Sequence, residues 1–288
     1  MADPNKRLPN NVPGNFFVDA TCINCDTCRQ LATKVFGEAH GLSFVKSQPH
    51  NEDESRNATR ALLSCPTGSI GTTGANKAKE VMGDFPISID NGVYYCGFNS
   101  PKSFGGNSYF VTHDSGNWLI DSPKFLPHLV SRFKELGGVK YIFLTHRDDV
   151  ADAEQYAEVF GAQRIIHEAD ASAQADAEIQ LRGHEVSKLE KDFLIIPTPG
   201  HTRGHCVLLY DNKYLFTGDH MAFDRDKQEL EAWPDVCWYD WDKQKASIER
   251  LADFSFEWVL PGHGQQVHLP AERMRQELAA LSKRIAKT

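Results

Sequence analysis

Three cysteines lie close together near the start of the chain, at Cys22, Cys25 and Cys28. A Cys-x2-Cys-x2-Cys loop can turn three thiolates toward one point, and a fourth thiolate must then come from elsewhere. Cys65 suits this role because Pro66 follows it at once, and a Cys-Pro pair is typical of an iron–sulfur ligand. The spacing therefore favours a [4Fe–4S] cluster held by these four cysteines.

The region from Asn15 to Thr73 resembles a single-cluster ferredoxin domain. Two-cluster ferredoxins carry a further cysteine four residues after the third, where this chain has Ala32. The alternatives are a zinc site with four thiolates or inert thiols. Zinc modules usually show two separated Cys-x2-Cys pairs, and this chain has a triplet and a single Cys-Pro instead.

A second set of candidate ligands follows short apolar segments in the later part of the chain. Each segment ends in a polar turn that carries one of four residues: His146, His201, Asp219 and His263. Side chains from the ends of several strands can converge at one edge of a sheet, and neighbouring glycines permit the tight turns this requires. Imidazole and carboxylate ligands suit zinc or iron, so these residues predict a metal site, with Asp148 as a candidate further ligand.

These segments resemble the metallo-β-lactamase family in their order along the chain and in their residues. The matching stretches are Pro199-Gly-His-Thr202, Thr217-Gly-Asp219 and Pro261-Gly-His263. The resemblance covers about Phe85 to His268. It implies an α/β fold, the αββα sandwich, with a small α+β ferredoxin-like domain in front of it.

The first metal motif of that family is altered in this chain. The family pattern is His-x-His-x-Asp-His, whereas Asp148 here replaces the second His, and Val150 and Ala151 replace the last two ligands. Asp149 and Asp152 lie next to the lost positions, but a shift of one residue along a helix rotates a side chain by about 100°. We therefore expect neither to substitute directly, and at most one tightly bound metal ion, either iron or zinc. Its ligands would be His146, His201 and Asp219, with Asp148 as a fourth, while His263 belongs to the second position.

The two centres together favour an oxidoreductase. Two histidines and one carboxylate describe a mononuclear iron site, and within the family the persulfide dioxygenases are similar in using one iron there. A hydrolytic zinc site needs no electrons, whereas a redox-active iron site can exchange them with a cluster. Asp148 or His263 would then act as proton donor or acceptor.

Two alternatives stay open. One is a zinc-dependent hydrolase of a thioester-like substrate, similar to the glyoxalase II branch of the family. The other is a non-catalytic electron carrier whose hydrolase domain has decayed. The degenerate first motif supports the second alternative, in which Asp148 or Asp149 merely caps the helix that follows.

Composition limits the partners. The chain has 288 residues, with 31 basic and 39 acidic side chains and a net charge of −8. Without a Lys/Arg cluster it is a poor candidate for nucleic acid, and no apolar run is long enough for a bilayer. We expect a small-molecule substrate and a protein electron donor or acceptor. The polar N-terminus lacks an apolar signal segment, so we expect a cytoplasmic protein, or a stromal one if the source is a photosynthetic eukaryote with plastids.

The elements that must position these residues follow from periodicity and turns. We predict a polar tail over residues 1–14, a ferredoxin-like domain over 15–75, a linker over 76–84 and the larger domain over 85–288. Two hairpins, around residues 90–92 and 114–117, open the larger domain. Predicted strands cover 141–144, 193–196, 206–210, 214–216 and 258–260, and predicted helices cover 31–36, 55–63, 125–136, 150–160 and 270–286.

Overall fold

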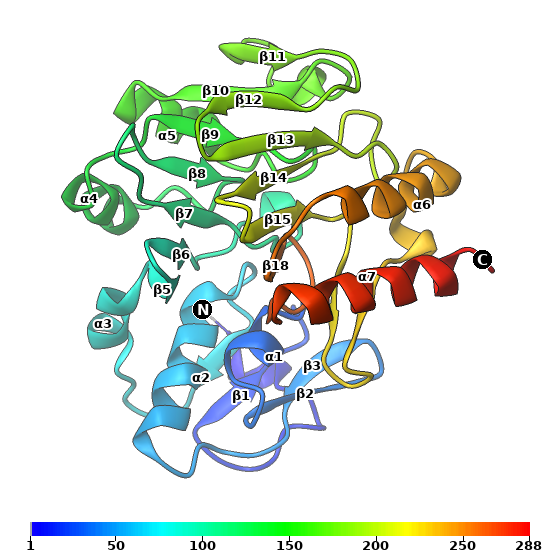
Figure 1. Cartoon of the computed structure of the whole chain (residues 1–288). Coiled ribbons are helices and arrows are strands. Elements are labelled where there is room, and N and C mark those ends of the chain that lie inside the picture. Colours follow the sequence, from blue (N-terminus) through cyan, green and yellow to red (C-terminus); the bar gives the residue numbers. More distant parts are fainter. Residues whose placement is uncertain (1) are drawn as a thin grey trace.

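A computed structural model describes residues 2–288 as a large C-terminal domain and a small N-terminal domain (Figure 1). The large domain contains two sheets packed face to face. The first has seven strands in the order β11-β10-β9-β8-β7-β6-β5. Their bounds are β5 (Ile87–Asp90), β6 (Val93–Tyr95), β7 (Tyr109–Val111), β8 (Trp118–Ile120), β9 (Tyr141–Phe143), β10 (Gln163–His167) and β11 (Ile179–Leu181).

The second sheet has six strands in the order β12-β13-β14-β15-β18-β19. Their bounds are β12 (Ser187–Glu190), β13 (Phe193–Pro197), β14 (Cys206–Tyr210), β15 (Tyr214–Gly218), β18 (Trp258–Pro261) and β19 (Val267–His268). Each sheet mixes parallel and antiparallel pairs, such as the parallel pair β15–β18 beside the antiparallel pair β14–β15. Successive side chains of a strand point to opposite faces of the sheet, so those of β13, β14 and β15 alternate between the core that separates the two sheets and the core beneath α6 and α7.

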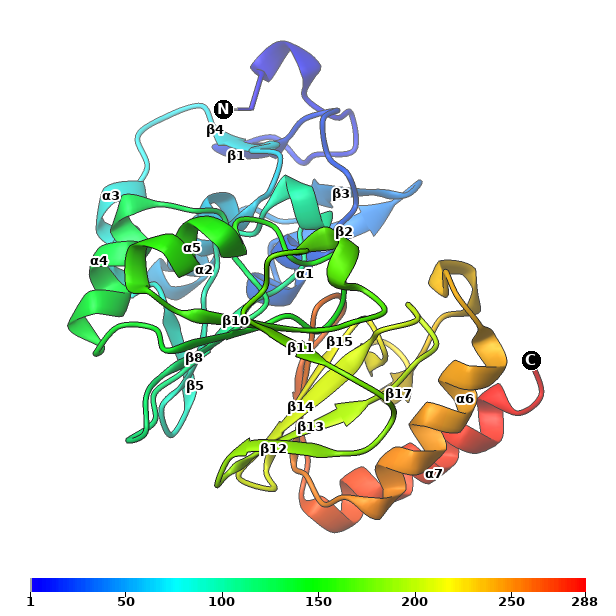
Figure 2. The ribbon, with the colours of Figure 1, turned by 90° about the horizontal axis from the view of Figure 1, so that it is seen from above.

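Helices cover the outer face of each sheet (Figure 2). These are α4 (Pro127–Glu135) and α5 (Ala153–Phe160) on the first sheet, and α6 (Trp241–Arg250) and α7 (Ala271–Ile285) on the second. Four buried side chains of α7, namely Met274, Leu278, Leu281 and Ile285, recur at helical spacing and pack on the second sheet. The order helix, sheet, sheet, helix confirms the predicted αββα sandwich.

The N-terminal domain has its own small core around two strand pairs and two helices. Its elements are β1 (Phe16–Val18), α1 (Thr27–Leu31), β2 (Phe36–Ala39), β3 (Leu42–Val45), α2 (Glu52–Ser64) and β4 (Ile70–Thr72). The residues before β1 pack on this domain rather than forming a free tail. The buried Asn11 side chain bonds to the backbone of Leu8, Val18 and Val45.

Some local predictions differ from the structure. The predicted hairpins of the large domain are confirmed, but the helix predicted over 31–36 is wrong, because Phe36 begins a strand that pairs with β3. His40 and Gly41 adopt positive φ, which allows the tight turn between β2 and β3. The predicted linker contains α3 (Ala78–Val81) and a 3-10 turn (Met82–Asp84), held by ion pairs from Arg56 and Arg60 to Asp84.

A further hairpin leaves the second sheet and reaches the N-terminal domain. It consists of β16 (Ala222–Asp224) and β17 (Glu229–Glu231). Arg225, in its turn, bonds to the Asp26 carboxylate and to the Arg29 carbonyl of the small domain. No helix in residues 2–288 combines the length and the apolar composition that crossing a membrane requires.

Candidate functional site

The cysteine loop of the small domain is built from both of its helices. Cys22 and Cys25 lie in the loop before α1, Cys28 lies on α1, and Cys65 follows the last residue of α2. The loop turns sharply because Asn24 and Asp26 adopt left-handed φ values of 58° and 66°, which these residue types tolerate better than most. All four cysteines are free and line one common cavity.

This cavity suits an iron–sulfur cluster. Two of its sulfur atoms accept backbone hydrogen bonds, Cys65 Sγ from Ser69 at 3.3 Å and Cys22 Sγ from Asn24 at 3.4 Å. Burial raises the pKa of Cys25 to about 11 and raises that of Cys28 as well, so buried thiolates here need a cation. Iron ligation supplies that charge, and the N–H donors would tune the reduction potential.

The predicted metal ligands of the large domain converge at the ends of β9, β13, β15 and β18. The Asp219 carboxylate is the centre of the group. Its Oδ2 lies 3.6 Å from Nε2 of His146, 3.6 Å from Nε2 of His201 and 3.8 Å from Nε2 of His263. These separations are too long for good hydrogen bonds. Those to His146 and His201 match ligands that share one ion at about 2 Å from each, whereas His263 lies outside the candidate ligand sets of the described residues.

Buried atoms without partners support a cation at this point. His146 Nε2, His201 Nε2 and Asp219 Oδ1 are buried and have no hydrogen-bond partner within the described part of the chain. Buried polar atoms are normally paired, so an ion between them would satisfy the group. Burial alone would lower the pKa of His146. The carboxylates of Asp149 and Asp219 outweigh burial and raise this pKa to about 10, which also indicates that the site needs positive charge.

Asp148 lies on the open side of this group. Its Oδ2 is 3.7 Å from His201 Nε2 and 3.9 Å from His146 Nε2, and its side chain is half-buried. The neighbouring His201 ring lowers the pKa of Asp148. His146, Asp148 and His201 therefore form one candidate ligand set.

Asp149 also reaches the site, against our expectation. It forms a second candidate set with His146 and Asp219, and burial together with the charge of Asp219 raises its pKa well above the usual range. Residues 146–152 are not helical, so the rotation of about 100° per residue that a helix imposes does not apply to Asp149. Ala151 has a φ of +37°, and α5 begins only at Ala153.

Glycine makes room for these two carboxylates. A Cβ on Gly262 would lie 2.6 Å from Asp219 Oδ1 and 2.8 Å from Asp149 Oδ2. Asp152, by contrast, points elsewhere and pairs with Lys102 at 2.6 Å. In the sequence, the pair Asp148-Asp149 was the feature that could have pointed to Asp149 as a site residue. The direction of its side chain, however, depends on the conformation of the loop.

Further buried groups orient the ligands. The Thr145 hydroxyl lies 3.0 Å from His146 Nδ1 and donates to Asp121 at 3.0 Å. Burial raises the pKa of Asp121 to about 7. His205 and His220 stack with ring centroids 5.2 Å apart, and burial lowers the pKa of His220 to about 3 and that of His205 well below its usual range, so both stay neutral. Neither belongs to a candidate ligand set of the described residues.

Comparison with known proteins decides the family. Residues 89–282 match the model of the metallo-beta-lactamase superfamily. The chain belongs to the metallo-beta-lactamase superfamily. Residues 18–72 match the 4Fe-4S single cluster domain of ferredoxin I, so the two domains imply an iron–sulfur cluster and a metal site.

Relatives within the superfamily differ in how much they share with this chain. The uncharacterized protein YobT of Bacillus subtilis (strain 168) is 28% identical over 217 residues, which is 64% of this chain and 93% of that protein. Hydroxyacylglutathione hydrolase of Klebsiella pneumoniae subsp. pneumoniae is 31% identical over 116 residues, 39% of this chain and 46% of that protein. The chain thus spans about half the length of the hydroxyacylglutathione hydrolases that it matches.

Solved structures share the fold of the large domain. A metallo-beta-lactamase from Pontibacter korlensis has a TM-score of 0.52 and 19% identity, covering 70% of this chain and 98% of its own. A metallo-beta-lactamase family protein from Thermus thermophilus has a TM-score of 0.51 and 19% identity, covering 69% of this chain and 81% of its own. At this identity the likeness shows the fold alone.

The metallo-beta-lactamase site and the cysteine loop open into one cleft of about 1130 Å³. Two consecutive glycines separate the two centres. A Cβ on Gly105 would lie 3.1 Å from Cys25 Sγ, and one on Gly106 would lie 2.8 Å from Asp149 Oδ2. With about 3.8 Å between consecutive Cα atoms, the Cys25 sulfur and the Asp149 carboxylate are no more than about 13 Å apart.

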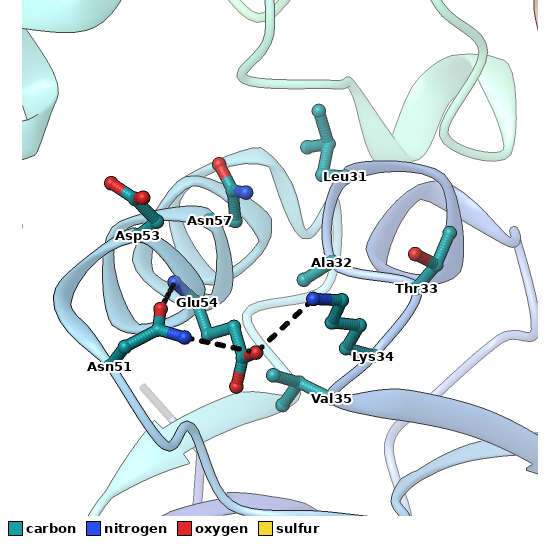
Figure 3. A pocket seen from close by; sticks show the side chains of 9 residues that line it. All are labelled: Leu31, Ala32, Thr33, Lys34, Val35, Asn51, Asp53, Glu54 and Asn57. Carbon is teal, nitrogen blue, oxygen red and sulfur yellow. Dashed lines mark hydrogen bonds and ion pairs between the residues drawn. The ribbon is translucent and has the colours of Figure 1, made fainter.

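A smaller pocket of about 210 Å³ lies between α1 and the start of α2 (Figure 3). Its polar side chains are already engaged in hydrogen bonds at the N-terminus of α2. Asn51 accepts the Glu54 N–H at 2.9 Å, and the Glu54 carboxylate accepts from Asn51 and Lys34. Neither histidine nor cysteine lines it, and its Glu54 carboxylate is already engaged by Asn51 and Lys34, so we place no candidate site there.

Proposed function

We propose that this chain is an oxidoreductase in which the [4Fe–4S] cluster exchanges electrons with a mononuclear metal centre, preferably iron. The single observation that carries this proposal is the short path from Cys25 to Asp149 across Gly105 and Gly106. A cluster held by Cys25 and a metal ion beside Asp149 would then be near enough to exchange electrons by tunnelling, whereas a hydrolytic site uses no electrons.

In this proposal some residues of the chain hold the metal ion and others handle protons, and Asp148 is a candidate for either role. His146, His201 and Asp219, with Asp148, would hold the metal ion, which would supply a one-electron couple and open positions for a substrate. Asp148 is half-exposed to the cleft and His263 is partly exposed. Each can pass a proton between the cleft and a bound substrate. The substrate would be a small molecule in the cleft, with a protein partner as external electron donor or acceptor.

The test is anaerobic purification followed by elemental analysis and electron paramagnetic resonance of the reduced protein. We expect iron in excess of the cluster and a second centre that takes up electrons in a reductive titration. His201→Ala should lose this second centre and keep the cluster signal, whereas Cys65→Ser should lose the native cluster signal and keep the second metal. Zinc as the one metal beyond the cluster would overturn the proposal.

The similarity to hydroxyacylglutathione hydrolases favours a second candidate, a zinc-dependent hydrolase of thioesters. In that case the same residues would hold zinc, which activates water when three protein ligands leave a position open. The decisive assay is hydrolysis of a hydroxyacylglutathione by the wild type and by Cys65→Ser. Turnover that survives in the variant would favour the hydrolase, and absence of any second metal would favour a plain electron carrier.

A further inference from the structure

Exposed aromatic side chains gather at the cleft between the two domains. Within residues 2–288, three tyrosine, tryptophan or phenylalanine side chains are exposed: Phe104, Trp238 and Tyr239. Phe104 and Trp238 line the cleft, with 58% and 62% of their surface exposed, and Trp233 and Val236 continue the same wall. Apolar surface left exposed together in a cleft marks a binding site more often than chance placement.

Each of the two exposed rings lies beside one histidine of the candidate metal site. The Phe104 ring centroid is 6.3 Å from that of His263, and the Trp238 ring centroid is 6.2 Å from that of His201. Both histidines approach the same Asp219 oxygen, and all five residues line the one cleft. Phe104 also has a φ of +50°, a backbone conformation that is uncommon for a bulky residue and that clusters at functional sites.

One cation of the cleft is available to a ligand. Lys102 pairs with Asp152 at 2.6 Å, and Arg29 pairs with Asp26 at 2.6 Å. Arg147 is half-exposed, and its nearest carboxylate in the described chain, Asp148, lies 3.7 Å from its Nε. A guanidinium with free donors is the group best shaped to receive a carboxylate through two parallel hydrogen bonds.

The acidic residues of the cleft are largely compensated once the site is loaded, because a divalent metal ion offsets two of the three site carboxylates. Asp148, Asp149 and Asp219 belong to the candidate metal ligand sets, and Asp26 is paired with two arginines. Glu231 is half-buried, and burial raises its pKa. Arg147 and the metal ion are then the positive groups that an anionic ligand meets in the cleft.

We propose that the cleft binds a small aromatic carboxylate, with its ring against the exposed aromatic side chains, Phe104 and Trp238, and its carboxylate on Arg147. This inference rests on the proposed function in that it names the substrate class of the same site. Binding does not depend on the direction of electron flow or on the identity of the metal. A measurement of binding without turnover therefore separates the two proposals.

The experiment is anaerobic isothermal titration of the full chain, with its cluster and metal, using 2-naphthoate as the probe. The neutral 2-naphthamide tests the charge, and cyclohexanecarboxylate tests the aromatic ring. We expect 2-naphthoate to bind about tenfold more tightly than either. Equal binding of 2-naphthamide or of cyclohexanecarboxylate would overturn the proposal.

Matched variants locate the bound molecule. Trp238→Ala should weaken 2-naphthoate binding about tenfold, because a large buried contact area is lost. Tyr239→Ala is its control, since Tyr239 is exposed but does not line the cleft. Arg147→Gln should bind 2-naphthoate and 2-naphthamide alike, whereas Arg182→Gln, far more exposed and outside the cleft lining, should still discriminate.

Unchanged cluster signals and metal contents would show that each variant has folded. Equal losses in Trp238→Ala and Tyr239→Ala, or discrimination that persists in Arg147→Gln, would overturn the proposal. A zinc-only preparation that still binds 2-naphthoate in this pattern would keep the ligand class while removing the oxidoreductase proposal.

Discussion

The Asp149 carboxylate should favour metal binding and, at the same time, destabilise the metal-free protein. Its buried carboxylate faces Asp219 and has an oxygen without a partner in the described chain, and its pKa is raised well above the usual range. The charged form is therefore costly at neutral pH unless a cation is present. We expect Asp149→Asn to raise the melting temperature of chelator-treated protein and to lower metal affinity by at least about tenfold.

Asp148→Asn is the matched control at the neighbouring position. The Asp148 side chain is half-exposed and its pKa is lowered by His201, so its charge costs the metal-free protein little. Its loss should weaken metal binding without stabilising the metal-free form. Melting curves with and without chelator, together with elemental analysis, distinguish the two variants. A lower melting temperature for chelated Asp149→Asn would contradict our view of that carboxylate.

At the scale of single elements, the β16–β17 hairpin connects the cleft to the cluster loop. Arg225 bonds to Asp26, which lies directly after Cys25, and to the Arg29 carbonyl. Arg225→Gln leaves the Asp26 charge less compensated, and added negative charge disfavours the reduced cluster. We expect its reduction potential to fall by tens of millivolts in a redox titration followed by electron paramagnetic resonance.

The control for this change is Arg284→Gln. Arg284 also holds the hairpin, through the Leu230 carbonyl and Glu229, but from the side of α7 rather than from the cluster loop. It should leave the potential nearly unchanged. An equal shift in both variants would mean that the hairpin acts through its general position and not through the charge of Arg225.

The edge of the first sheet should show a distinct pH dependence. Arg164 on β10 is buried and holds Glu178, and this bond lowers the pKa of Glu178 from 4.5 to about 2. The resulting stability is complete above pH 4.5, where the unfolded carboxyl is ionised, and is lost as pH falls toward 2. Arg164→Gln should lower the free energy of unfolding by about 2 kcal/mol at pH 7.

The difference between Arg164→Gln and wild type should shrink between pH 4.5 and pH 3, as measured by urea unfolding at each pH. Arg275→Gln serves as the comparison, because its pair with Glu272 lies at the surface of α7, where such pairs contribute little. A constant difference across this pH range would show that Arg164 acts by packing alone.

At the scale of the whole molecule, the domains meet where Gly105 packs on the cluster loop. Gly105 has a φ of +87°, and a Cβ there would lie 2.8 Å from Cys25 Cβ and 2.9 Å from Pro66 Cγ. Gly105→Ala should therefore separate the domains or displace the loop. Gly41→Ala is its control, since Gly41 has a similar φ of +73° but no atom within 4 Å of the added Cβ.

Both alanine variants pay the cost of a left-handed backbone, about 1 kcal/mol. Gly105→Ala should melt several degrees lower than Gly41→Ala and should also change the cluster signal in electron paramagnetic resonance. Identical melting temperatures and signals would show that close contact at Gly105 is not needed to join the two centres.

The sequence alone determined the two families, the αββα layering and the four-cysteine motif. The cysteine motif depends on local spacing, as in the Cys-x2-Cys-x2-Cys loop, whereas the families and the layering followed from the resemblance of short motifs to known families. It also placed His146, His201, Asp219 and His263 at the ends of strands, where a sheet edge gathers side chains from distant parts of the chain. Such patterns can be read from the sequence without knowing which residues are in contact in the folded chain.

Tertiary structure decided what depends on loop direction and on contacts between distant segments. The side chain of Asp149 enters the site because the residues before α5 turn through a positive φ at Ala151 instead of continuing a helix. Phe36 joins a hairpin because β3 offers it a partner, which outweighs weak helical spacing. The approach of Cys25 to Asp149 depends on Gly105 and Gly106 packing between two domains, and no local pattern encodes a contact between surfaces that far apart in sequence.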